Sequence, residues 1–92
     1  MRHILVSSRR PGLVSELREL SGDGATFLVE HGVDETLERL GRSARIDAVI
    51  TDDIEIETAI RDEIPGMIPI YRALSDEEAA SIWAGASALL AS

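Results

Sequence analysis

Short apolar runs alternate with amphipathic segments along the whole chain, and this alternation restricts its fold more than any other feature. The runs are rich in branched aliphatic residues and bounded by turn residues, so we expect strands over residues 4–6, 25–29, 46–50 and 67–71. Apolar residues recur at helical spacing over residues 11–20, 34–40 and 56–64. Strands that alternate with helices in this way predict an α/β protein with a parallel sheet.

The C-terminal quarter of the chain is compatible with two structures. Ser75 and Glu78 have the spacing of a capping box, which predicts that a helix begins there. The alanines after Gly85 favour more helix, whereas Gly85 itself favours a break before a short strand over residues 86–91. The residues alone leave both structures open.

Composition excludes several classes of protein. Ninety-two residues with 45% hydrophobic content predict one globular domain, residues 1–92. A net charge of −8 argues against binding to nucleic acid or to an anionic membrane surface, because both need clustered cations. The sequence has no cysteine, no signal-peptide pattern and no apolar stretch of membrane-spanning length. We therefore expect a cytoplasmic protein.

Asp52 is the candidate functional residue, because it follows the apolar run 46–50 and precedes a helical segment. A parallel strand presents such a residue at the carboxyl edge of its sheet, where ligands gather in open α/β folds. Asp53 follows directly. Two roles remain open for this pair: a binding site, or capping of the next helix through hydrogen bonds to its first N–H groups.

Five stretches of the chain match, in order, the motifs of one known family. They are residues 3–11, 33–37, 47–52, 68–70 and 84–90. Together they resemble the receiver domain of bacterial response regulators, which has a flavodoxin-like fold with strand order 2-1-3-4-5. The resemblance implies a three-layer open parallel sheet and favours a fifth strand over residues 86–91. It also implies that Asp52 stands where the family carries its phospho-accepting aspartate.

The same resemblance implies that parts of a phosphorylation site are missing. The family's metal-binding acidic pair after the first strand falls on Ser8 and Arg9. Its hydroxyl after the fourth strand falls on Leu74, beside Ser75. Its lysine has no counterpart, since all nine basic residues are arginines. Phosphoryl transfer depends on positioned cations, so the resemblance predicts a degenerate site without enzymatic activity.

Three functions are compatible with these residues. We expect a non-catalytic receiver-like signalling or protein-interaction module without a cofactor, in which Arg9 or Arg10 pairs with Asp52 in place of Mg²⁺. The first alternative is a receiver-like protein that is phosphorylated or binds Mg²⁺ at Asp52, with Asp53 as a second ligand. The second alternative is a flavodoxin-like scaffold of another function, because fold does not fix function.

The expected partner is another protein, and the resemblance suggests where it binds. The family's last helix has no counterpart in the sequence, so one face of the sheet would be left bare. A bare apolar face marks a contact surface, and the simplest way to cover it is a two-fold homodimer. The candidate interface residues are Val49, Ile70, Trp83 and Leu89.

Overall fold

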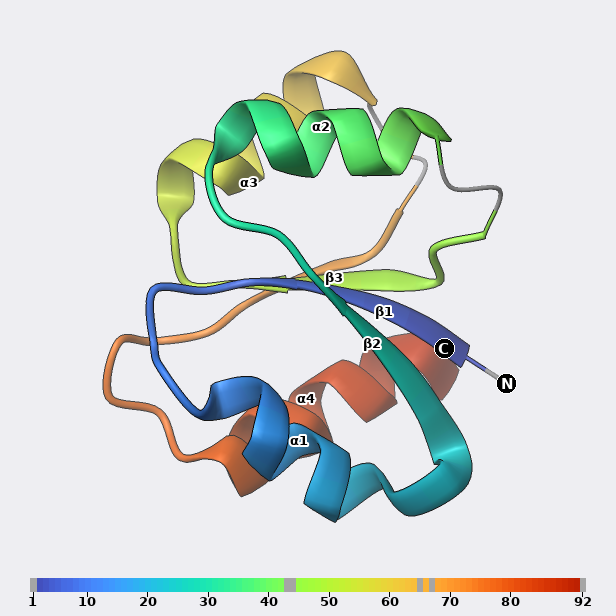
Figure 1. Cartoon of the computed structure of the whole chain (residues 1–92), viewed down its shortest axis with the longest axis vertical. Coiled ribbons are helices and arrows are strands. Elements are labelled where there is room, and N and C mark those ends of the chain that lie inside the picture. Colours follow the sequence, from blue (N-terminus) through green and yellow to red (C-terminus); the bar gives the residue numbers. More distant parts are fainter. Residues whose placement is uncertain (1, 43–44, 65, 67, 92) are drawn as a thin grey trace.

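The computed structural model describes residues 2–42, 45–64, 66 and 68–91. In this part of the chain, parallel strands form one sheet in the order β2-β1-β3-β4, with helices on both faces (Figure 1). The strands are β1 (Arg2–Ser7), β2 (Ala25–Val29), β3 (Ala48–Thr51) and β4 (Ile70–Arg72). The helices are α1 (Leu13–Ser21), η1 (Gly22–Gly24, a short 3₁₀ turn), α2 (Val33–Arg42), α3 (Ile54–Glu63) and α4 (Ala79–Ala91). The predicted α/β class, the parallel sheet and the order of its first four strands are confirmed.

Side chains that alternate along the central strands build two separate cores. Ile4 and Ile50 face α1 and α4, whereas Leu5 and Val49 face α2 and α3. All four side chains have no exposed surface. The central strands carry uninterrupted apolar runs because helices cover both faces of the sheet.

The order of the strands creates a crevice at the carboxyl edge of the sheet. From β1 the chain moves outward to β2, and from β2 it crosses β1 to reach β3. Crossovers in opposite directions place α1 on one face of the sheet and α2 and α3 on the other. The loops after β1 and β3 therefore diverge, and the space between them is where open α/β sheets bind ligands.

The expected fifth strand over residues 86–91 is wrong, because α4 runs without a break from Ala79 to Ala91. Gly85 lies inside this helix, where the ring of Tyr71 from β4 packs against it. A Cβ at Gly85 would lie 2.7 Å from Tyr71 Cζ, closer than any ordinary contact. The glycine allows strand and helix to pack closely and does not end the helix.

The expected bare face is wrong for the same reason. α4 lies beside α1 against the sheet (Figure 1), and its residues Ile82 and Ala86 are fully buried there. The last helix of the chain thus covers the face that was expected to be open. Homodimerisation stays a prediction, without a bare face as its reason.

The candidate interface residues do not share one surface. Val49 is fully buried against α2 and α3 and cannot form an interface. Ile70 is half-buried on that same face, because it pairs with Val49 in the β3–β4 register. Trp83 is half-buried on the opposite face, with its ring centroid 5.8 Å from that of Phe27. Leu89 is half-buried on α4.

β4 is shorter than the strand expected over residues 67–71, and Met67 lies outside the described residues. Across the described ranges, no helix is long and apolar enough to cross a membrane.

Candidate functional site

Asp52 lies in the crevice between the loops that follow β1 and β3. Ser7, the last residue of β1, pairs with Thr51, the last residue of β3, so the next residues of both loops lie side by side. A pocket of about 240 Å³ opens between them. It is lined by Ser7, Ser8, Arg9, His31, Gly32, Asp52, Asp53 and Ile56. The structure thus brings the predicted site residues Ser8, Arg9, Asp52 and Asp53 together.

The carboxylate of Asp52 has a hydrogen-bond donor on each oxygen. The Ser8 hydroxyl donates to Oδ2 at 2.6 Å, and the Arg9 backbone N–H donates to Oδ1 at 3.3 Å. The Arg10 backbone N–H donates to Ser8 Oγ at 3.0 Å, which leaves the hydroxyl proton of Ser8 free to point at Asp52. Both donors to Asp52 come from the single loop between β1 and α1.

Asp53 has a different role, as the N-cap of α3. Its Oδ1 accepts the Glu55 backbone N–H at 2.9 Å, and its Oδ2 forms an ion pair with Arg9 Nη2 at 2.9 Å. The hydrogen bond from the Glu55 backbone, followed by the Arg9 guanidinium, lowers the pKa of Asp53 below its ordinary value. The predicted capping role is confirmed for Asp53.

The expected ion pair between an arginine and Asp52 is wrong. The Arg9 guanidinium reaches Asp53, and Arg9 contacts Asp52 only through its backbone N–H. The short Ser8 side chain and this N–H already occupy Asp52, so the guanidinium extends past it to the rim, where its side chain is 81% exposed. Arg10 points in another direction, described below.

The hydrogen bonds also limit what the two aspartates can do chemically. Asp53 is engaged by its helix cap and by Arg9, and Asp52 by Ser8. Within the described ranges, no group of three or more His, Cys, Asp and Glu side chains is placed to hold a metal ion. A cation at this site would meet the Arg9 guanidinium on Asp53 and the Ser8 hydroxyl on Asp52, whereas Mg²⁺ is usually held by one or two carboxylates and several waters.

Ser75 and Leu74, the remaining predicted site residues, differ in their placement. Ser75 lines a second hollow of about 290 Å³ together with Arg9, Arg10, Pro11 and Asp52. Leu74 is 66% exposed and brings no hydroxyl to the site. Five of the six predicted site residues therefore line one of the two hollows, and Leu74 lines neither.

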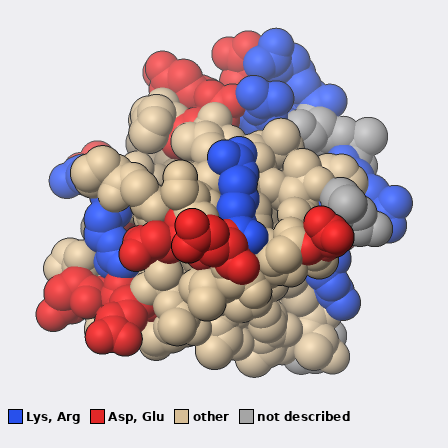
Figure 2. Space-filling view, turned by 60° about the horizontal axis from the view of Figure 1, so that its bottom comes forward, with Lys and Arg blue, Asp and Glu red and all other residues tan. Residues whose placement is uncertain are grey.

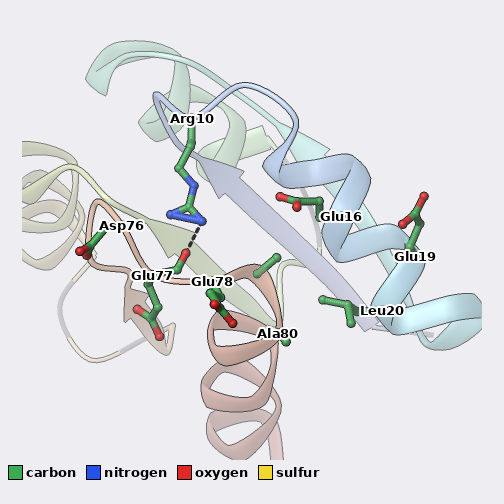
Figure 3. A pocket seen from close by; sticks show the side chains of 9 residues that line it. Arg10, Glu16, Glu19, Leu20, Asp76, Glu77, Glu78 and Ala80 are labelled. Carbon is green, nitrogen blue, oxygen red and sulfur yellow. Dashed lines mark hydrogen bonds between the residues drawn. The ribbon is translucent and has the colours of Figure 1, made fainter.

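Arg10 connects the Asp52 site to the segment before α4. Its guanidinium donates to the backbone carbonyls of Ser75, at 3.3 Å, and of Glu77 (Figure 3). Because the Arg10 backbone N–H also holds Ser8, one residue joins the Asp52 carboxylate to the turn that precedes α4.

Glu77 organises this turn, and sequence reasoning missed it. Its carboxylate accepts the Tyr71 hydroxyl at 2.5 Å, the Leu74 backbone N–H at 3.1 Å and the Ser81 hydroxyl at 2.8 Å. The predicted capping box at Ser75 is wrong, since α4 begins only at Ala79. The run of acids 76–78 does not indicate which one turns inward. Only the position of Tyr71 on the neighbouring strand selects Glu77.

The contacts of Glu77 predict a pH dependence of stability. The hydrogen bond from Tyr71 is the largest cause that lowers the pKa of Glu77 below its ordinary value of 4.5. The unfolded chain therefore binds this proton more readily than the folded protein does. The stabilisation is present above about pH 4.5 and is lost as the pH falls through the lower, folded pKa.

Urea unfolding of the wild-type protein and of Glu77→Gln checks this prediction. At neutral pH we expect the variant to lose about 1–2 kcal/mol, because hydrogen bonds to a charged acceptor weaken. Below the ordinary pKa of glutamate the difference should shrink. Glu78→Gln, at an exposed neighbouring position, is the control and should leave the acid slope unchanged. A constant difference between wild type and Glu77→Gln across the acid range would contradict the assignment.

Compared with known proteins, the chain matches no protein-family model, no curated protein and no solved structure. The function is therefore argued from the site alone.

Proposed function

We propose that the protein is a non-catalytic, receiver-like protein-interaction module whose Asp52 site is held closed by its own residues. The observation that supports this most is the hydrogen bond from Ser8 to Asp52 Oδ2, at 2.6 Å. A phosphoacceptor aspartate needs a free oxygen for the phosphoryl group and a cation beside it. Here the second oxygen also has a donor, the Arg9 backbone N–H.

The charges around Asp52 support a fixed structure better than a switch. Arg9 forms an ion pair with Asp53, and Arg10 is bound to two carbonyls before α4. These cations belong to the chain and cannot dissociate as Mg²⁺ can. A site of this kind keeps the β1–α1 loop, the start of α3 and the turn before α4 in one arrangement.

The receiver-like part of the proposal rests on architecture and on the position of Asp52. A parallel sheet in the order 2-1-3-4, with helices on both faces, is compatible with the first four strands of a flavodoxin-like fold. Asp52 directly follows β3 in that sheet. In this proposal a protein partner, in signalling or in another process, recognises the fixed surface of the domain.

Intact-mass measurement after incubation with acetyl phosphate and Mg²⁺ tests the proposal. We expect no gain in mass for the wild-type protein, because each Asp52 oxygen has a hydrogen-bond donor and the neighbouring Asp53 is engaged by Arg9 and by its helix cap. Asp52→Asn is the matched control for any modification elsewhere. A gain that this variant abolishes would instead support the phosphorylated, Mg²⁺-dependent alternative.

A further inference from the structure

A hollow lies between α1 and the segment that leads into α4, away from Asp52. It measures about 590 Å³. We call it the α1–α4 groove (Figure 3). Its lining residues are Arg10, Glu16, Glu19, Leu20, Asp76, Glu77, Glu78, Ala79 and Ala80.

Each wall of the α1–α4 groove contributes apolar side chains, Leu20 from α1 and Ala79 and Ala80 from the start of α4. In Figure 3 the side chain of Leu20 from α1 points across the groove towards Ala80 at the start of α4. Leu20 is 46% exposed, which makes it one of the few large hydrophobic side chains that the described structure leaves open to water. A half-exposed leucine in a hollow offers an apolar contact to a side chain of a partner.

The rims of the α1–α4 groove carry carboxylates on both sides. Glu16 and Glu19 lie on α1, and Asp76 and Glu78 lie on the other wall (Figure 3). Among the described residues these four form no ion pair, whereas Glu30 and Glu57 elsewhere pair with arginines. Figure 2 turns this side of the molecule forward and shows acidic groups beside a broad uncharged surface.

The single cation of the α1–α4 groove cannot neutralise these rims. Arg10 lies at one end, and its guanidinium is held by the carbonyls of Ser75 and Glu77. The carboxylates are spread along two walls, so they suit several separate cationic groups better than one. The combination of apolar side chains between the walls and carboxylates on both rims complements an amphipathic segment with basic residues on both sides of an apolar stripe.

We propose that the α1–α4 groove binds a basic amphipathic helix of a partner protein. An apolar side chain of that helix packs on Leu20 and Ala80, and flanking arginines or lysines pair with the carboxylates of the rims. The walls are α1 on one side and the turn before α4 with its first residues on the other, and a helix can present an apolar stripe flanked by basic side chains to such a surface. The inference rests on the proposed interaction function and adds to it the surface and the chemistry of the partner.

The test uses the full chain and a short synthetic peptide in which arginines flank a leucine stripe at helical spacing. Peptide binding is followed by the shifts of backbone amide signals in NMR spectra. We expect saturable shifts around Glu16–Leu20 and Glu78–Ala80, and none for the same peptide with glutamates in place of arginines. Saturable shifts centred on any other surface would overturn the proposal, as would the absence of shifts.

Two charge-matched variants separate the groove from the general negative charge. Glu16→Gln with Glu78→Gln removes one carboxylate from each wall and should weaken peptide binding about fivefold, as expected for two partly exposed ion pairs. Asp62→Asn with Glu63→Gln removes the same charge at the exposed end of α3 and should leave the affinity unchanged. Equal weakening by both variants would overturn the proposal.

A failure of the groove proposal gives a different result from a failure of the proposed function. Binding at a different surface would overturn the groove but leave the interaction module standing. Phosphorylation of Asp52 by acetyl phosphate would overturn the non-catalytic module, whereas the peptide shifts of the unphosphorylated protein test the groove separately.

Discussion

Replacement of Gly85 by alanine is expected to lower the free energy of unfolding by about 2 kcal/mol. Alanine is the better helix former by about 1 kcal/mol, but its Cβ would overlap the Tyr71 ring that packs on Gly85. Overpacking of this kind costs about 1–3 kcal/mol, and the overlap with an aromatic ring places the cost near the upper end. In a chain of this length the melting temperature should fall by about 10 °C.

The ring of Tyr71 provides the control for this prediction. In a Tyr71→Val background the space beside Gly85 is open, so Gly85→Ala should stabilise the protein by about 1 kcal/mol through helix propensity. The change of sign between the two backgrounds identifies the ring as the cause. If Gly85→Ala stabilises the protein with Tyr71 in place, the packing of α4 against β4 described above is wrong.

The double substitution Ser8→Asp with Arg9→Asp is expected to create a Mg²⁺ site that the natural sequence lacks. Ser8 Oγ lies 2.6 Å from Asp52, so a carboxylate at this position would stand beside that of Asp52. The change at Arg9 removes the cation that pairs with Asp53. Without metal, the gathered carboxylates should destabilise the variant, because like charges repel and the Ser8 hydrogen bond is lost.

Thermal unfolding of the double variant at increasing Mg²⁺ concentration measures how much the bound ion stabilises it. At about 100 times the dissociation constant, Mg²⁺ should stabilise the variant by about 2.7 kcal/mol, while the wild-type protein should not respond. Ser15→Asp with Arg45→Asp makes the same change in charge at exposed positions and controls for general screening. A folded variant that does not respond to Mg²⁺ would show that Ser8 and Arg9 are not what closes the site.

The central strands could be predicted from the sequence because burial on both faces leaves a strong local signal. Val6 and Ile50 belong to uninterrupted aliphatic runs, which only a sheet covered by helices on both sides buries. The position of Asp52 followed from the same pattern, since residues after parallel strands meet at one edge of a sheet. The strand order and the place of Ser8 beside Asp52 were implied by the resemblance to receiver domains.

The C-terminal helix could not be predicted in the same way, because the role of Gly85 depends on a contact with a residue distant in sequence. Locally, glycine indicates a break. In the folded protein it accommodates Tyr71, fourteen positions earlier in the chain, and the helix continues. The faces of β3 were misassigned for a related reason. Alternation places Val49 and Ile50 on opposite faces, but it does not reveal which face carries α4.

The details of the site depend on side-chain reach, which sequence patterns do not encode. Two arginines beside two aspartates predicted an ion pair with Asp52, yet the Arg9 guanidinium extends to Asp53. The inward turn of Glu77 depends on Tyr71 and on the Leu74 N–H, which the fold alone brings together. Residue types at the site could be predicted, but their pairing could not.

In the proposed function, Asp52 is held by hydrogen bonds from its own chain and does not accept a phosphoryl group. The intact mass of the wild-type protein after incubation with acetyl phosphate and Mg²⁺ tests this most directly. The Ser8 and Arg9 donors on the two Asp52 oxygens predict a mass that does not change. A gain of one phosphoryl group, absent in Asp52→Asn, would contradict the claim.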